Sequence, residues 1–378
     1  MADFYDARGN TYFVASPEEI GQFAEIPRTA AGAAMSRGQW AVRAIERICG
    51  RLNASCTPAG AQSPQQAKTG LAGDPATSAP AGDPASPPQQ TQNRRLPGAP
   101  AGKRFLSDGL LVGPFPDENA FGMLIVNTDG TLAERSGNGL TIFSQFLVDT
   151  GQANRTDAFV VRIYHDKPPA PLVEARIEAA VRDGRNGFWI DMGVPTYGLS
   201  AVGASPEHVG VSEFEGRGTF RVFDLEQIEA SWTCSQFVNV GNPHCVTFLK
   251  NPSLLPSMEQ IGSPNWLPRL TAIANSTESD GVRGEGRPCK NGINLQWASL
   301  LGPDTIAARV FERGEGPTLS SGSSATAVAS AARALGLLGA KTVNVAMPGG
   351  VAPVRFDESD GILKRVMLFG EAQRTTPR

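Results

Sequence analysis

The chain has 378 residues, which is long enough for two ordinary domains and a well-buried core. Hydrophobic residues make up 40% of it and charged residues 19%, as is typical of a soluble globular protein. The formal net charge of −3 argues against nucleic acid or an anionic membrane surface as a partner. No apolar run approaches the roughly 20 residues that a membrane-spanning helix needs.

The N-terminus and the cysteines indicate a reducing compartment. The opening segment, "MADFYDARGNTYFV", lacks the basic stretch and apolar core of a secretory signal. The five cysteines are far apart and form no CxxC pair, which argues against a disulfide framework or a structural zinc site. We therefore expect a cytoplasmic protein. The cysteines are Cys49, Cys56, Cys234, Cys245 and Cys289.

The first predicted element is a short surface helix, and a low-complexity tract follows it. In "MSRGQWAVRAIERICGRL", Trp40, Ile45 and Ile48 recur at near-helical spacing. Residues 53–102 consist mainly of Pro, Ala, Gly, Gln and Ser, with almost no large apolar side chains. Such a tract cannot bury enough surface to offset its ordering entropy, so we expect a disordered insertion there.

From Arg104 onward the sequence is mostly strand-like. Short β-branched or aromatic runs such as "DAFVVRIYHD", "NGFWIDMG" and "TIAARVFERG" end at Gly, Asn, Asp or Pro. Two long helical segments interrupt them: "SGNGLTIFSQFLVDTG" from Ser136 and "SSGSSATAVASAARALG" from Ser320. Both are apolar nearly all round, which is typical of buried helices. The composition predicts an α+β fold.

The two helical segments share their surroundings. "VNTDGTLAERSGNG" and "VFERGEGPTLSSGSS" both pass from a strand through a polar turn and a Thr-Leu pair to a serine–glycine junction. This echo suggests two related halves, each built around one helix. A helix N-terminus carries unpaired N–H groups and a partial positive charge, so two of them facing one cleft could hold a carboxylate. Alternatively, Ser136 and Ser321 are simply N-caps.

Five motifs follow one another along the chain: "DARGNTYFV", "NTDGTLAERSGNG", "VGNPHCV", "GINLQW" and "ERGEGPTLSSGSSA". In this order they resemble the motifs of the diaminopimelate epimerase family, whose superfamily includes proline racemases and the phenazine-pathway isomerase. The resemblance implies two pseudo-symmetric domains, each a mostly antiparallel β-barrel wrapped around a central helix. It implies domains at residues 1–154 with about 364–378, and at 155–363. Members of this family are isomerases that use neither pyridoxal phosphate nor a metal. The resemblance is also compatible with a homodimer.

Site residues carry over from the matching motifs. The resemblance implies a catalytic pair at Ser136 and Ser321, with His244 and Glu312 as assisting groups, at the α-carbon of an amino acid such as LL- or meso-diaminopimelate. It also implies residues that bind the rest of the substrate, including the end that is distal to the α-carbon. The expected binding residues are Asn10, Asn127, Gly137, Asn138, Asn242, Asn294, Glu312, Arg313, Gly322 and Ser323.

Serine at both junctions is a departure, because the family has cysteine at these two positions. A thiol has a pKa of about 8.5, whereas the pKa of a serine hydroxyl is closer to that of water, which is about 15.7. This pKa difference of at least about five units makes a serine alkoxide roughly 7 kcal/mol harder to form than a cysteine thiolate. A neighbouring general base can offset part of this cost.

Four interpretations follow from the departure. The first is an amino-acid epimerase in lysine biosynthesis, with serines exchanging the α-proton. The second is an isomerase or lyase of specialised metabolism, acting on a substrate with a more acidic C–H. The third is a lapsed homologue that binds an amino acid without turnover. The fourth is replacement of cysteine by design, although the divergence of neighbouring residues favours a natural origin.

Overall fold

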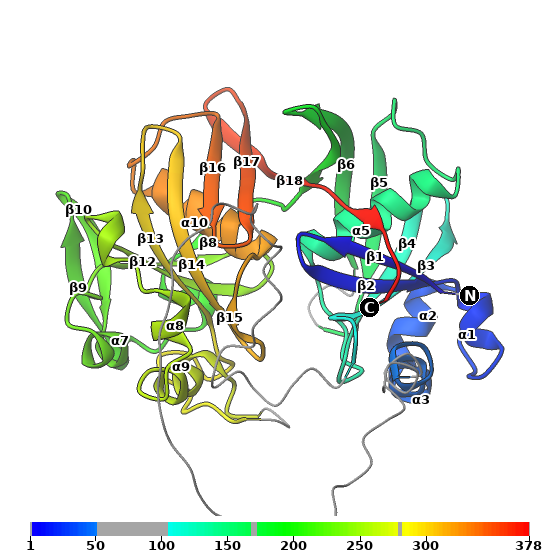
Figure 1. Ribbon diagram of the computed structural model, residues 1–378, viewed down its shortest axis with the longest axis horizontal. Helices are drawn as coiled ribbons and strands as arrows, with labels where there is room; N and C mark the ends of the chain where they lie inside the picture. Colours follow the sequence, from blue (N-terminus) through cyan, green and yellow to red (C-terminus); the bar gives the residue numbers. More distant parts are fainter. Residues whose placement is uncertain (1, 51–104, 168–171, 279–281, 378) are drawn as a thin grey trace, which may run out of the picture.

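The computed structural model describes residues 2–50, 105–167, 172–278 and 282–377. The tract at 53–102, expected to be a disordered insertion, lies outside the described residues. Two halves stand side by side, one around helix α5 (Gly137–Asp149) and the other around helix α10 (Gly322–Ala334) (Figure 1). Both chain ends lie on the α5 side.

Among the described residues, seven strands make up the half around α5. In this part of the chain they pair mostly antiparallel, and the parallel pairs are β2–β3 and β4–β5. Three helices with a following π-helical turn at Glu46–Gly50 cover the outside of this half. The strands are β1 (Asp3–Ala7), β2 (Asn10–Ala15), β3 (Gly109–Asp117), β4 (Ala120–Asn127), β5 (Phe159–Tyr164), β6 (Leu172–Arg182) and β7 (Arg185–Asp191). The helices are α1 (Pro17–Gly21), α2 (Ala30–Met35) and α3 (Arg37–Ile45).

In the described part of the α10 half there are ten strands, again mostly antiparallel, with β12–β13 and β14–β16 parallel. They are β8 (Thr196–Tyr197), β9 (Val209–Phe214), β10 (Arg217–Val222), β11 (Ser235–Asn239), β12 (Pro243–Phe248), β13 (Asn294–Leu300), β14 (Thr305–Glu312), β15 (Gly316–Thr318), β16 (Thr342–Met347) and β17 (Gly350–Ser359). Its helices are α6 (Leu199–Val202), α7 (Phe223–Ile228), α8 (Met258–Ile261) and α9 (Leu267–Ala274), with 3₁₀ turns at Pro206–His208 and Pro252–Leu254.

Strand β18 (Ile362–Gly370) joins the two halves. It pairs with β17 on the α10 side and with β7 on the α5 side, and the last strand, β19 (Gln373–Arg374), pairs with β1 (Figure 1). Because β5, β6 and β7 pair with β4 and one another, the strands of the α5 half extend to Asp191. The domain boundary expected at 154/155 therefore falls inside this strand-paired half.

The composition of each central helix explains its burial. In α5, large side chains such as Leu140, Ile142 and Phe143 are fully buried against the strands. In α10, alanines and small polar residues from Ser324 to Ala332 are all buried, and their size lets the strands approach closely. Burying an apolar surface of this extent is the main stabilising contribution to such a fold. The predicted α+β fold of strands around two buried helices is confirmed.

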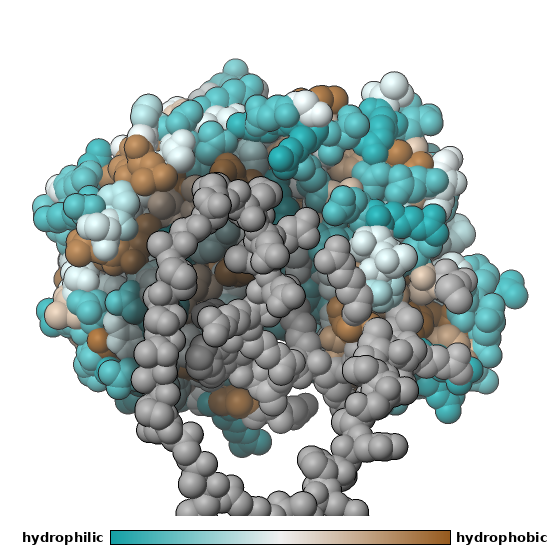
Figure 2. All heavy atoms as spheres, viewed as in Figure 1, coloured by the Kyte–Doolittle hydropathy of each residue, from teal (hydrophilic) through white to brown (hydrophobic). Residues whose placement is uncertain are grey.

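The helix predicted around Trp40 also forms, as α3. Trp40 is fully buried, and its indole N–H donates to the Ala33 carbonyl at 2.9 Å. On the surface, the face seen in Figure 2 is mainly hydrophilic, and its hydrophobic side chains lie in scattered patches. Among the described residues, no helix has both the length and the apolar character needed to cross a membrane.

Candidate active site

The two serine–glycine junctions have nearly identical backbones. Ser136 precedes α5 with φ −143° and ψ 118°, and Ser321 precedes α10 with φ −148° and ψ 125°. The Gly139 N–H donates to Ser136 Oγ at 3.0 Å, and the Ser324 N–H donates to Ser321 Oγ at 3.3 Å. Both serines are therefore N-caps, the simpler of the two roles considered for them. Capping uses only acceptor capacity, so each hydroxyl proton remains available to a second partner.

The tips of the two helices meet. A Cβ built on Gly137 would lie 3.6 Å from the Gly322 Cα, and one built on Gly322 would lie 3.6 Å from the Gly137 Cα. Leu368 of β18 packs against both tips, because either Cβ would approach its Cδ2 to 2.6 Å. The partial positive charges of two buried helices thus converge on one point. This convergence is what the repeated junction in the sequence predicts.

Gly322→Ala is expected to destabilise the fold by about 1–3 kcal/mol, because the added methyl overlaps Leu368 in a packed core. Urea denaturation measures the change in the free energy of unfolding. In the background of Leu368→Ala the same methyl has room, so its cost there should be much smaller. Gly339→Ala, where nothing lies within 4 Å of the new Cβ, is the control. Equal costs at positions 322 and 339 would contradict the close contact.

Glu312 is the direct partner of the second serine. At the end of β14, its Oε1 accepts the hydrogen bond of the Ser321 hydroxyl at 2.7 Å. Burial raises the pKa of Glu312, with the Ser321 hydrogen bond opposing the rise and Glu315 adding to it. A carboxylate at this distance can receive a proton from serine, which is the arrangement required of a general base.

Tyr12 lies close to the first serine, and the sequence prediction missed it. Burial raises the pKa of Tyr12, the nearby Ser136 side chain opposes the rise, and Glu312 adds to it. Tyr12 is only 8% exposed, and Glu312 in turn binds Ser321. Both hydroxyls therefore belong to one polar cluster that spans the two halves. The signal was available, because Tyr12 follows Asn10 at the period-two spacing of a strand face.

His244 is fully buried, and its ring nitrogens bind residues other than the two serines. Its Nε2 pairs with Asn242 Oδ1 at 2.8 Å, and the Gln296 amide donates to its Nδ1 at 3.0 Å. Burial lowers the pKa of His244 to about 3, so the ring is neutral at physiological pH. The same Gln296 amide lies 3.1 Å from Ser324 Oγ in the first turn of α10. Through Gln296, His244 thus links the Asn-Pro-His turn to the first turn of α10.

Asn294 and Arg313 form a second connection on the α10 side. The Asn294 amide donates to the Pro243 carbonyl at 3.0 Å, and its oxygen accepts from the Arg313 N–H at 2.9 Å. The Arg313 guanidinium donates to the Asn291 carbonyl at 2.7 Å. These contacts fix the strand ends around the Asn-Pro-His turn. Arg313 keeps further N–H groups for a ligand, whereas both ends of the Asn294 amide already bind the protein.

The remaining expected site residues surround the helix tips or the nearby turns. The Asn10 amide donates to the Ser320 carbonyl at 3.4 Å, linking the β1–β2 hairpin to the approach to α10. The Asn127 amide donates to Thr131 Oγ1 at 2.9 Å, so this side chain stabilises the turn after β4. Ser323 Oγ lies 3.4 Å from Ser321 Oγ.

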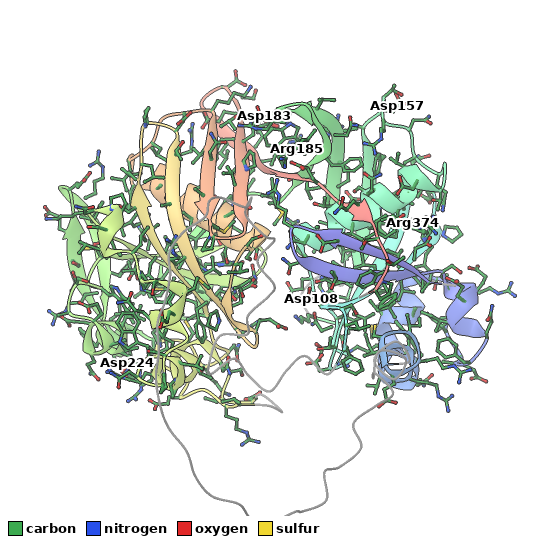
Figure 3. All side chains as sticks on the ribbon, in the orientation of Figure 1. Asp108, Asp157, Asp183, Arg185, Asp224 and Arg374 are labelled. Carbon is green, nitrogen blue, oxygen red and sulfur yellow. The ribbon has the colours of Figure 1, made fainter. Side chains whose placement is uncertain are left out.

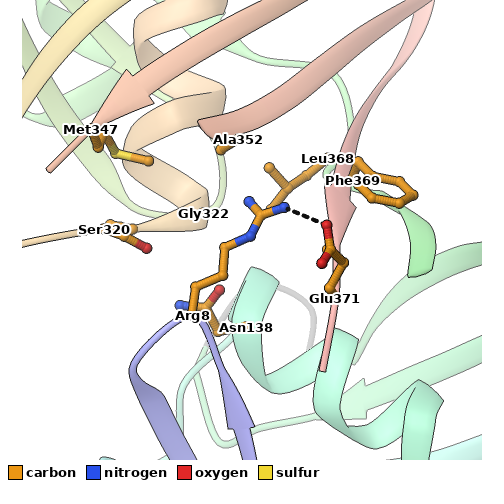
Figure 4. Close-up of a pocket in the computed structure, with 11 residues that line it drawn as sticks. Arg8, Asn138, Ser320, Gly322, Met347, Ala352, Leu368, Phe369 and Glu371 are labelled. Carbon is orange, nitrogen blue, oxygen red and sulfur yellow. Dashed lines mark ion pairs between the residues drawn. The ribbon is translucent and has the colours of Figure 1, made fainter. Parts of the chain in front are cut away.

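A small cavity opens beside the tips (Figure 4). Its lining includes three of the expected site residues, Asn138, Ser321 and Gly322. Arg8 reaches into it from the β1–β2 hairpin, with its Nη2 3.7 Å from Glu371 Oε1. Arg8 has a positive φ of 55°, a strained conformation for a residue other than glycine. The sequence interpretation did not include this arginine.

Acidic side chains lie on the α5 side of the site. Asp108 lies at the edge of this half that faces the other (Figure 3), and its carboxylate accepts from the Thr11 N–H at 2.7 Å. It contributes to the raised pKa of both Tyr12 and Glu312. Among residues 2–50, 105–167, 172–278 and 282–377, no group of three His, Cys, Asp or Glu side chains could hold a metal ion.

Comparisons with known proteins agree with this geometry. The diaminopimelate epimerase family model matches residues 236–375. "Diaminopimelate epimerase 2" of a Nostoc species is 32% identical over 251 residues, covering 65% of this chain and 72% of that protein. Diaminopimelate epimerase of Microcystis aeruginosa is 28% identical over 271 residues, covering 71% of this chain and 81% of that protein. This chain belongs to the diaminopimelate epimerase family.

Membership in the diaminopimelate epimerase family makes the chain a member of a group of epimerase-type isomerases. A probable proline racemase from Agrobacterium radiobacter has a similar fold, with a TM-score of 0.53 at 13% identity, covering 99% of this chain and 90% of that one. A phenazine biosynthesis protein of the PhzF family from Bacillus anthracis aligns with a TM-score of 0.52 at 11% identity, covering 99% and 96%. The resemblance to this superfamily is confirmed.

Proposed function

We propose that the protein is a cofactor-independent isomerase that exchanges the proton on the α-carbon of an amino acid with a second polar end, such as LL- or meso-diaminopimelate. The observation that carries the proposal is the 2.7 Å hydrogen bond from Ser321 to Glu312 at the tip of a buried helix. It provides the serine with a base, which a hydroxyl needs in order to remove a proton from carbon.

In this proposal the helix tips hold the α-carboxylate. The N–H groups of the first turns of α5 and α10 converge there, and they stabilise negative charge that spreads onto the carboxylate as the α-proton leaves. Ser321 takes the proton from one face of the carbon and passes its own to Glu312. Ser136 then delivers its hydroxyl proton to the opposite face, which inverts the centre. After the product leaves, Ser136 regains a proton from solvent and Glu312 releases its proton to solvent. The return reaction uses the same groups in reverse.

The two serines have different partners, so their roles differ. Ser321 donates to a carboxylate, which favours its action as a base, whereas Ser136 lies beside the Tyr12 phenol. A phenol with a raised pKa stays protonated, which makes it a donor able to stabilise oxygen charge on Ser136. In this scheme neutral His244 is a positioning residue, because its two ring nitrogens bind Asn242 and Gln296.

A second candidate function has one observation in its favour. Serine is a weaker base than thiolate even with Glu312 beside it, which favours substrates whose C–H is more acidic than that of an amino acid. A double-bond shift or a β-elimination would meet this condition. A cytoplasmic homodimer acting in lysine biosynthesis belongs to the first candidate and remains a proposal with it.

Deuterium incorporation tests the proposal. Diaminopimelate is incubated with the protein in D₂O, and loss of the α-proton signal is followed by NMR. Exchange above the rate with Ser136→Ala/Ser321→Ala protein supports the proposed reaction. Absence of exchange from folded protein, as judged by cooperative thermal unfolding, would remove diaminopimelate as the substrate and leave the second candidate.

A further inference from the structure

Gln296 is a buried polar side chain on the inner face of β13, and the proposed reaction gives it no role of its own. It is fully buried, as is His244 on the neighbouring strand β12. Val246 and Ala298, which lie two residues further along the same faces of β12 and β13, belong to the hydrophobic core that includes α10. Polar groups on such an apolar face are costly unless they are hydrogen-bonded. The hydrogen bonds of Gln296 therefore decide how this polar pair is accommodated.

The side-chain amide of Gln296 donates to two partners. Its Nε2 lies 3.0 Å from Nδ1 of His244 and 3.1 Å from Oγ of Ser324, in the first turn of α10. Its oxygen is buried and has no hydrogen-bond partner among the described residues. The reversed orientation would place the NH₂ group where the oxygen has no partner, and unpaired buried N–H groups are rarer than unpaired carbonyl oxygens. The amide nitrogen is thus held toward His244.

This donor fixes the tautomer of His244. An amide N–H can only donate, so Nδ1 of the ring is the acceptor and Nε2 carries the single proton of the neutral ring. Burial lowers the pKa of His244 to about 3, so the ring remains neutral at physiological pH. The Nε2–H group then donates to Asn242 Oδ1 at 2.8 Å.

The proton on His244 in turn orients the Asn242 amide. Because Oδ1 accepts from the ring, Nδ2 is directed away from it and makes no hydrogen bond to any of the described residues. Asn242 is only half-buried. The preceding residue, Gly241, lies against the first junction, since a Cβ built on it would be 3.6 Å from the Arg135 Cβ. Asn242 therefore offers two N–H donors at the boundary between the halves.

We propose that Gln296 is a positioning residue that holds His244 in the Nε2–H tautomer and thereby makes Asn242 a hydrogen-bond donor to the substrate. The tautomer follows from the contacts alone, whereas the effect on substrate binding rests on the proposed function. In the other tautomer Nε2 is an acceptor, so Asn242 would donate to the ring and present its oxygen instead. Without Gln296 the two tautomers compete, and only a fraction of the molecules presents the donors.

Nitrogen-15 NMR of the imidazole rings tests the tautomer, because protonated and unprotonated ring nitrogens have different chemical shifts. The chain has three histidines, so single substitutions of His165, His208 and His244 assign the signals. Wild-type protein at neutral pH is expected to carry the His244 proton on Nε2 alone. In Gln296→Met, which keeps the size of the side chain but removes the donor, both nitrogens should share the proton. A proton on Nδ1 in wild-type protein would overturn the inference without the need for any variant at position 296.

Gln145→Met is the matched control for the substitution. Gln145 is also buried, but its side chain binds Asp149 and Arg155 and no histidine among the described residues. This variant should leave the His244 signals and the affinity for ligand unchanged. A tautomer that shifts equally in Gln145→Met and Gln296→Met would contradict a specific role for Gln296.

Calorimetric Kd values for diaminopimelate measure the consequence for binding. Gln296→Met is expected to weaken binding about 5–10-fold, the equivalent of one neutral hydrogen bond, while kcat is largely kept because Ser321 retains Glu312. In the Asn242→Ala background the same substitution should change Kd by less than about twofold, because Gln296 acts through Asn242. Equal losses in the two backgrounds would overturn the inference. The expected tautomer in a protein that does not bind diaminopimelate would support the inference and count against the proposed substrate alone.

Discussion

Glu312→Gln is expected to lower kcat for α-proton exchange by about 10²–10⁴-fold, the usual contribution of a positioned general base. The amide preserves the shape of the side chain and can still accept from Ser321, but it cannot take up the proton. The 2.7 Å hydrogen bond makes this carboxylate the most direct assistant of either serine. Deuterium wash-in with the substrate identified for the wild-type protein gives the rates.

The pH profile provides the corresponding signature. Glu312 must be ionised to accept the Ser321 proton, and burial raises its pKa, so activity should fall with decreasing pH before an ordinary glutamate would titrate. Glu315→Gln is the control, because Glu315 raises the pKa of Glu312 through its charge. Removing that charge should shift the acid limb to lower pH while the maximal rate persists. A full rate in Glu312→Gln would exclude Glu312 as the base.

Restoring both thiols, with Ser136→Cys and Ser321→Cys together, is expected to raise the exchange rate about 10–10³-fold. Thiolate formation is favoured over alkoxide formation by about 7 kcal/mol. General-base assistance of the serine offsets about 2.7–5.5 kcal/mol of this difference, which leaves a net gain of about 1.5–4 kcal/mol. The same deuterium assay measures the gain.

Alkylation distinguishes a catalytic gain from an indirect one. Three described native cysteines, Cys49, Cys245 and Cys289, are buried, and Cys234 is partly exposed. Iodoacetamide should therefore inactivate the double-cysteine protein while leaving the wild-type rate nearly unchanged. A double variant that folds and is slower than wild type would show that the cleft is adapted to hydroxyl chemistry or to another reaction.

The sequence predicted the junctions well because their signals are local. A serine followed by glycines and a helix apolar all round defines both an N-cap and a buried helix, and Ser136 and Ser321 appear in these roles. The order of five motifs added the family and the fold. The convergence of the two tips followed from the internal echo, although nothing in one segment specifies its distance from the other.

Contacts between segments that are far apart in the sequence could not be predicted from it. Tyr12 lies close to Ser136 although more than a hundred residues separate them in the sequence, and Leu368, on a strand near the C-terminus, packs against both helix tips. His244 was predicted to assist the serines, but its ring nitrogens bind Asn242 and Gln296, and that pairing depends on the register of β12 beside β13. The parallel pairing of β5 with β4 joins strands on either side of the expected domain boundary at 154/155, and no local sequence signal specifies such a pairing.

The single-serine variants test most directly whether the two helix tips act on opposite faces of one carbon. Ser136→Ala and Ser321→Ala are each incubated with LL- and meso-substrate in D₂O, and inversion and wash-in are measured separately at each stereocentre. Both variants should lose inversion. Ser136→Ala should retain wash-in from the face of Ser321, which keeps its base, whereas Ser321→Ala should retain much less, because Ser136 has no base beside it. Inversion that persists in either variant, or wash-in that is faster in Ser321→Ala than in Ser136→Ala, would contradict the account.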